Sequence, residues 1–229
     1  MHQSISKSKI YFYLFLLILL STTINKYFIN NFAEFFKVKK ITIYGTTDKQ
    51  KQIINEKLKF IINQNIFKVD YKLIEKNLDK LNFYNNLNLK KKYPKNIKLN
   101  FIQTDLLGIF YQEGEKKFVG GNNKAISNDY VSSPQKLPVV FGKFEIKEYL
   151  NLIKILEKNN IKLSTIQNFY YHNSGRWDIK IIDAEYIMLS SQNLVSSIKK
   201  YKLFLKNKSL KKIKSIDLRV ENQISVIYE

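Results

Sequence analysis

The sequence predicts an α+β protein with an N-terminal single transmembrane helix, a β-α-α-β-β module and a domain built on a mixed β-sheet with flanking helices. Three observations support this prediction. An apolar run near the N-terminus carries no charge, two amphipathic helical stripes follow the first strand, and short alternating segments dominate the remainder. With 229 residues, of which 45% are hydrophobic, the chain suffices for one medium domain or two small ones.

The net charge of +20 comes from 39 Lys+Arg against 19 Asp+Glu, and the arginines are Arg176 and Arg219 alone. Proteins that read nucleic acid favour the planar guanidinium of arginine. We therefore attribute the lysine excess to composition and expect no nucleic-acid partner. The chain has no cysteine, which excludes disulfides, thiolate zinc sites and cysteine nucleophiles.

Residues 10–28 are predicted to form the transmembrane helix. Residues 10–20 read IYFYLFLLILL, and no charge lies between Lys9 and Lys26. A cleaved signal peptide is the alternative interpretation. Residues 21–23 (STT) make a poor cleavage site, which favours a retained anchor. Lysines flank the segment on both sides, so charge alone leaves its orientation open.

Residues 37–105 are predicted to form the β-α-α-β-β module. Helix caps are assigned from Asp, Ser or Thr before a helical stripe, and strands from alternating apolar residues. The expected elements are a strand over 38–44 ended by Gly45, a helix capped by Thr47 or Asp48, a helix capped by Asp70, and strands over 84–91 and 97–104 separated by Tyr93-Pro94.

Residues 106–229 are predicted to form the second domain. The expected elements are a hairpin of 109–111 and 117–119, a polar loop over 120–136, a helix over 145–159, strands over 165–171, 177–182 and 186–189, a helix carrying Leu194, Ile198, Tyr201 and Leu205, and strands over 213–220 and 224–228.

No catalytic constellation is found in the sequence. His2 and His172 have no partner at metal-ligand spacing, and we interpret His172 as a solvated turn residue rather than a general base. The pairs Glu113 with Glu115 and Asp183 with Glu185 are likewise interpreted as turn residues. No phosphate loop or nucleophile motif is present. We expect a protein that is not an enzyme, with no catalytic residue, metal or cofactor.

The last strand is expected at a sheet edge, where unpaired backbone groups accept a strand from a partner. Ile224, Val226 and Tyr228 would face one side, with Ser225 and Ile227 on the other. The alternative is a closing strand covered by its own helix, and the pattern does not separate the two. Arg219 shares a face with Asp217, so it forms either a local ion pair or a partner contact.

Five segments together resemble the FtsQ/DivIB family of bacterial cell-division proteins. FKVKKITIYG (36–45) is similar to the first strand of a POTRA domain, and YPKNIKL (93–99) to the entry to its last strand. LPVVFG (137–142), GRWDI (175–179) and IDLR (216–219) are similar to family segments of the β domain. The resemblance covers nearly the whole chain, from about residue 10 to residue 228.

The resemblance implies a divisome scaffold rather than a catalyst. It implies a cytoplasmic tail (1–9), a POTRA domain (37–105) and an FtsQ-type β domain (106–229), with a single pass through the cell inner membrane and both domains periplasmic at the septum. The implied partners are FtsB and FtsL at the β domain, which binds an FtsB segment along its last strand, and other divisome proteins at the POTRA domain. The implied partner-binding residues are Arg219, Val220, Glu221, Asn222, Gln223, Ile224, Val226 and Tyr228. The alternatives are an anchored POTRA-containing transport or assembly factor and a periplasmic binding protein.

Overall fold

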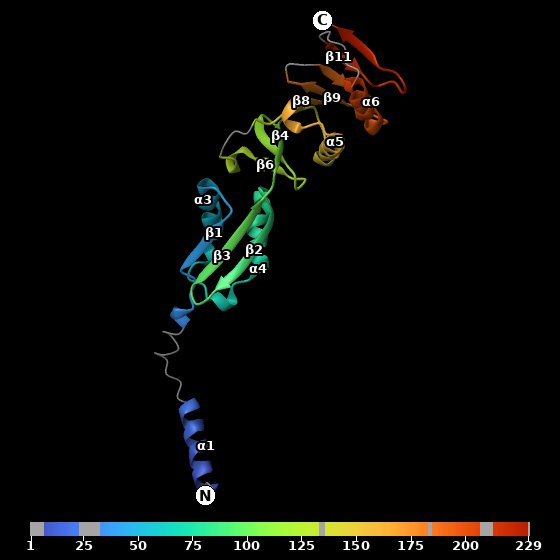
Figure 1. Ribbon diagram of the computed structural model, residues 1–229. Coiled ribbons are helices and arrows are strands. Elements are labelled where there is room, and N and C mark those ends of the chain that lie inside the picture. The colour runs from blue at the N-terminus through green and yellow to red at the C-terminus, as the bar shows by residue number, and fades with distance from the viewer. Residues whose placement is uncertain (1–6, 23–32, 133–135, 183–184, 207–212, 229) are drawn as a thin grey trace.

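The computed structural model describes residues 7–22, 33–132, 136–182, 185–206 and 213–228 (Figure 1). The chain is an α+β protein with two sheets. One has three strands in the order β1-β3-β2, and the other has nine in the order β12-β11-β10-β9-β8-β7-β4-β5-β6. The larger sheet is mixed, because β7 is parallel to β4 and β8 and β10 is parallel to β11.

The smaller sheet and its helices have the order β-α-α-β-β. Its elements are β1 (Lys40–Tyr44), α3 (Asp48–Lys57), α4 (Tyr71–Leu78), β2 (Tyr84–Lys92) and β3 (Asn96–Gln103), with single 3₁₀ turns at Lys59–Ile61, Ile66–Lys68 and Asp79–Leu81. The predicted caps are confirmed: Thr47 forms a capping box with Gln50 at the start of α3, and the Asp70 side chain accepts from the Lys72 backbone at the start of α4.

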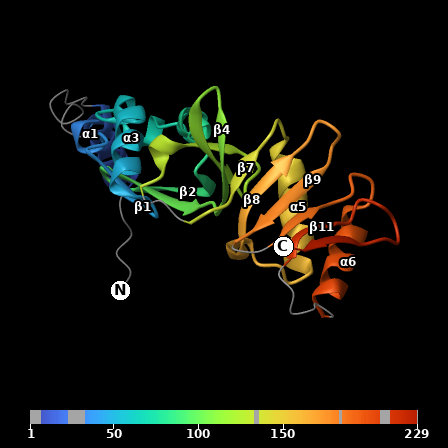
Figure 2. The same ribbon diagram turned by 90° about the horizontal axis from the view of Figure 1, so that it is seen from above.

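The larger sheet takes up the rest of the chain. Its elements are β4 (Leu106–Gln112), β5 (Glu115–Gly120), β6 (Ala125–Ser127), β7 (Val139–Phe141), α5 (Ile146–Lys158), β8 (Ile166–Tyr171), β9 (Trp177–Ile181), β10 (Tyr186–Met188), α6 (Leu194–Lys206), β11 (Ile213–Asp217) and β12 (Ser225–Tyr228), with 3₁₀ turns at Asn128–Tyr130 and Leu163–Thr165. Helices α5 and α6 pack on one face of this sheet (Figure 2), where Tyr149, Phe169 and Trp177 form the centre of the core.

The polar segment 120–136 is not simply a loop, and that prediction was wrong. It contains β6 and the 3₁₀ turn at Asn128–Tyr130, and Ile126 is fully buried. The Asn122 side chain donates to the carbonyls of Asn82 and Tyr84 at 2.8 and 3.0 Å. Long-range hydrogen bonds therefore order a stretch whose composition is typical of a loop. Ile126 packs in the same core cluster as α3 and α4, so packing continues across residue 105.

The predicted transmembrane helix over residues 10–28 is wrong. Within the described ranges, no helix combines the length and the apolar character needed to cross a bilayer. Helix α1 (Lys7–Thr22) has 16 residues, which is about 24 Å at 1.5 Å per residue, against a hydrocarbon core of about 30 Å. Near its end the Ser21 hydroxyl donates to the Ile18 carbonyl at 2.8 Å. The predicted single pass through the inner membrane depended on this span, so that prediction is also wrong. Residues 23–28 of the predicted span lie outside the described residues.

Candidate partner-binding edge

Strand β12 lies at the edge of the larger sheet, as predicted for the last strand. Of the strands that the structure describes, it pairs with β11 alone, in an antiparallel register. Val226 lies opposite Ile216 and Ser225 opposite Asp217. Residues 222–228 carry no charged side chain, so nothing on this segment opposes the approach of another strand.

Both faces of β12 present apolar side chains to solvent. Val226 is half-buried and packs on the core, which places its neighbours two residues away on the same face. Those neighbours, Ile224 and Tyr228, are 38% and 44% exposed, and Ile227 on the opposite face is 57% exposed. Sequence reasoning did not include Ile227 among the partner-binding residues. The edge is therefore apolar on both sides.

A tight turn precedes β12 and a lysine of α6 holds it. Asn222 has a left-handed backbone with φ of 60°, and the Gln223 amide donates to the Val220 carbonyl at 3.4 Å. The Lys200 ammonium donates to the carbonyls of Leu218 and Val220 at 3.1 and 2.7 Å. The Val220 side chain is 58% exposed, and Glu221 is exposed beside it. Sequence reasoning missed Lys200, because nothing in its sequence context separates it from a solvated lysine.

Arg219 forms the local ion pair with Asp217. Its Nε lies 2.9 Å from both carboxylate oxygens of Asp217, and an Nη lies 2.6 Å from Oδ2. The Arg219 amide also donates to Oδ1 at 3.0 Å. The Arg219 side chain stays 47% exposed, so the pair lies on the surface next to the β12 edge. Whether Arg219 also contacts a partner remains a prediction.

The hydrogen bonds from Arg219 hold the pKa of Asp217 below its ordinary value. The pair therefore stabilises the fold above the unfolded carboxyl pKa of about 3.9, and this contribution is lost as the pH falls through the lower folded value. We expect carboxyl NMR titration to give a depressed pKa for Asp217 and an upward shift of that pKa in Arg219→Ala. An unchanged Asp217 pKa in the variant would contradict this assignment.

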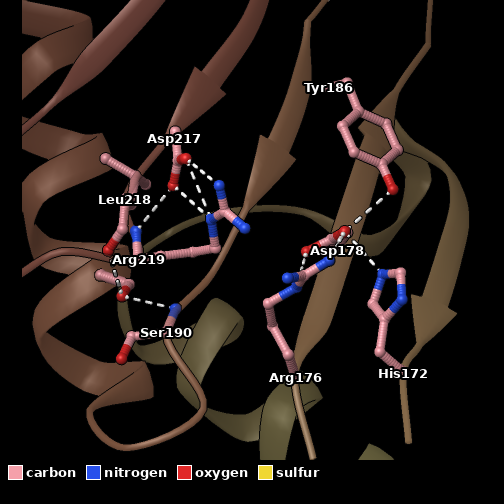
Figure 3. A network of polar contacts seen from close by, with 9 residues as sticks. His172, Arg176, Asp178, Tyr186, Ser190, Asp217, Leu218 and Arg219 are labelled. Atoms are coloured by element: carbon pink, nitrogen blue, oxygen red, sulfur yellow. Dashed lines mark hydrogen bonds and ion pairs between the residues drawn. The ribbon is translucent and has the colours of Figure 1, made fainter. Parts of the chain in front are cut away.

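A second polar network surrounds Asp178 on β9 (Figure 3). The Asp178 side chain is 2% exposed, and its Oδ2 lies 2.7 Å from His172 Nε2. Arg176 donates from Nε to Oδ1 at 3.0 Å and from an Nη to Oδ2 at 3.2 Å. The Tyr186 hydroxyl donates to Oδ2 at 3.0 Å. His172 lies in the β8–β9 turn and is partly exposed, as expected, but its ring also contacts the buried carboxylate of Asp178, which the sequence interpretation did not include.

The two networks lie side by side on the sheet. Met188 of β10 is in register with Asp178 on one side and with Asp217 on the other. The charge of Arg176 also contributes to the depressed pKa of Asp217. Asp178 of β9, Tyr186 of β10 and Asp217 of β11 thus lie on the same face of the sheet, opposite the face that carries the buried core residues.

Glu185, which the sequence analysis interpreted as a turn residue, is a buried carboxylate with a partner on α6. It is 2% exposed, and the Tyr201 hydroxyl of α6 donates to it at 2.7 Å. Burial raises the pKa of Tyr201, so its hydroxyl stays protonated and remains a donor. Asp183 lies outside the described residues. In the part of the chain that the structure describes, no cluster of three or more histidine or acidic residues suits a metal ion.

Two of the other outer strands, β6 and β2, are less open to a partner than β12. Strand β6 has three residues, and the chain after it is fixed to α3, with Gln50 donating to the Tyr130 carbonyl at 2.7 Å. Strand β2 ends in the lysine run 90–92, and charged edges oppose strand addition. β12 combines an outer position with an uncharged, apolar sequence.

Comparison with known proteins points to one family. The chain is 25% identical over 130 residues to the cell division protein DivIB of Macrococcus caseolyticus (strain JCSC5402), an alignment covering 56% of this chain and 43% of that protein. The chain thus matches less than half of the relative's length. No family model matches. The major extracytoplasmic domain of the trans isomer of DivIB from Geobacillus stearothermophilus aligns with 48% of this chain and 98% of its own, at 11% identity. Its TM-score of 0.33 is too low to establish a shared fold.

Proposed function

We propose that this FtsQ/DivIB-like chain acts in cell division as a scaffold without catalytic activity, and that it binds the FtsB–FtsL complex by β-strand addition at β12. The likeness to DivIB supports the cell-division role. One observation of the structure carries the binding mode: the uncharged, apolar strand β12 forms an outer edge of the nine-stranded sheet.

In this mechanism the backbone of β12 pairs with an extended segment of FtsB and so sets the register of the complex. Ile224 and Tyr228 contribute apolar contact on the helix-side face, and Ile227 on the other. Val226 anchors the strand to the core, and Lys200 holds the turn before it. The edge is therefore ordered before the partner arrives, which lowers the entropy cost of binding.

The Asp217–Arg219 pair flanks the entry to this edge. Its guanidinium is oriented by Asp217 and half-exposed, which suits a charge-assisted hydrogen bond to a partner carbonyl or carboxylate. We assign Arg219 this second contact as part of the proposal. The β-α-α-β-β module, which resembles a POTRA domain, would meet other divisome proteins.

The cell-division role is tested by the position of a fluorescent fusion of the full chain in dividing cells. We expect a ring at mid-cell that appears only in cells that are constricting or about to constrict. A uniform signal through successive divisions would contradict the role. The same measurement is made on a fusion that carries Ile227→Lys. If this variant no longer forms the mid-cell ring, its position in the cell depends on the β12 edge.

A further inference from the structure

Four aromatic side chains, Phe35, Phe36, Phe67 and Tyr93, gather beside the turn between β2 and β3. This turn lies at the end of the three-stranded sheet away from the nine-stranded sheet (Figure 1). The ring centroid of Phe36 lies 5.2 Å from that of Phe35 and 5.0 Å from that of Phe67, and Phe67 stacks on Tyr93 at 5.1 Å. Phe35, Phe67 and Tyr93 are 50%, 56% and 54% exposed. Large apolar side chains that cluster in the open mark an interaction surface.

Backbone hydrogen bonds fix this cluster in place. The Ile66 amide donates to the Phe36 carbonyl at 2.8 Å, and the Lys39 amide donates to the Lys95 carbonyl at 2.9 Å. The aromatic residues come from three separate parts of the sequence, so the fold rather than local sequence brings them together. The surface is formed before any partner binds.

Lysines surround the aromatic rings. Lys95 places its ammonium 4.9 Å from the centre of the Phe35 ring, and Lys91 donates to the Phe67 carbonyl at 3.3 Å. The segments that carry the aromatic rings, residues 35–39, 66–70 and 91–95, contain the lysines Lys37, Lys39, Lys68, Lys91, Lys92 and Lys95. The carboxylates beside them are engaged: Glu34 pairs with Lys37, and Asp70 caps α4. This end of the sheet, which we call the aromatic–lysine end, is therefore strongly positive.

We propose that the aromatic–lysine end binds the surface of an anionic lipid bilayer. Aromatic rings partition to the interface between headgroups and acyl chains, and surrounding lysines are attracted to acidic headgroups. The surface has no arginine, which disfavours nucleic acid as its partner. A polypeptide is held by a groove or a strand edge, whereas these rings project from connecting segments. The contact is peripheral and needs no helix that crosses the bilayer.

The test uses the full chain and vesicles of phosphatidylcholine alone or with about one third phosphatidylglycerol. The chain has no cysteine, so Phe67→Cys labelled with an environment-sensitive dye reports this surface alone. We expect the dye emission to shift to the blue with anionic vesicles and to remain water-like with neutral ones. The same dye at Lys154→Cys, on exposed α5, is expected to remain water-like with both.

Replacing lysines by glutamine measures how much their charges contribute to vesicle binding. Each lysine near an anionic surface contributes about 1 kcal/mol, so combining Lys39→Gln, Lys68→Gln and Lys92→Gln should weaken binding to anionic vesicles on the order of 100-fold. The matched control combines Lys147→Gln, Lys154→Gln and Lys158→Gln on α5. It should stay within about 2-fold, because charges more than a Debye length from the contact are screened. All six lysines are exposed, so thermal unfolding verifies that both variants fold.

Three results would overturn the proposal. Equal losses in the two triple variants would show a general effect of net charge. A water-like dye at position 67 on a chain bound to anionic vesicles would place the contact elsewhere. Equally tight capture of soluble polyglutamate through the same lysines, with no preference for vesicles, would assign the surface to an acidic polypeptide.

Discussion

Removal of residues 222–229 is expected to abolish capture of FtsB–FtsL, because it deletes β12 and with it the edge that we propose accepts the partner strand. The three-stranded sheet should stay folded, because none of the described residues 222–228 belongs to its core cluster. Co-purification of the partners with the truncated chain measures the effect, and capture at the level of the intact chain would contradict it.

The truncation also removes the half-buried Val226, so a point variant separates binding from stability. Ile227 is 57% exposed, and a lysine there adds charge to the edge without emptying the core. We expect Ile227→Lys to weaken partner binding by about 2 kcal/mol, roughly 30-fold, with little change in unfolding temperature. Ile102→Lys on β3 is the matched control, since Ile102 is 54% exposed on the other sheet. Equal affinities of the two variants would argue against β12.

The second large effect is expected at Asp178. In Asp178→Ala the buried carboxylate is lost, and Arg176, His172 and Tyr186 lose their shared acceptor. Breaking a buried ion pair typically costs 3–5 kcal/mol. We expect about 3 kcal/mol in the free energy of unfolding, because Arg176 and His172 are partly exposed and their polar atoms still reach water.

Asp217→Ala provides the comparison for this prediction. It also removes a carboxylate from an arginine pair, but that pair lies at the surface and should contribute no more than about 1 kcal/mol. Denaturant unfolding of both variants gives the two values. A loss in Asp178→Ala as small as that in Asp217→Ala would show that the network contributes little to stability.

Features set by neighbouring residues could be predicted from the sequence. The caps at Thr47 and Asp70 depend on a side chain and an amide two or three residues apart. Most of the strands follow from the alternation of apolar and polar residues. These interactions are short in sequence, so the pattern contains them in full.

Features set by distant residues could not be predicted. The Asn122 side chain donates to backbone carbonyls about forty positions earlier in the chain, and these bonds order its segment. The Lys200 ammonium of α6 donates to the Val220 carbonyl in the turn before β12, a contact between elements that are separate in the sequence.

The contact of His172 with Asp178 could have been predicted from the hairpin, because the pairing of Tyr171 with Trp177 brings the two residues close together. The predicted span over 10–28 was wrong, because no helix among the described residues has both the length and the apolar character needed to cross a bilayer.

The central claim is that a partner strand adds to β12, and backbone hydrogen exchange tests it most directly. Exchange is measured on the full chain, alone and saturated with FtsB–FtsL. Strand addition predicts that the alternate amides of β12 that point away from β11 become strongly protected in the complex, while those of β6 at the opposite edge keep their rates. A saturated complex in which these outward-pointing amides exchange as fast as in the free chain would contradict the claim.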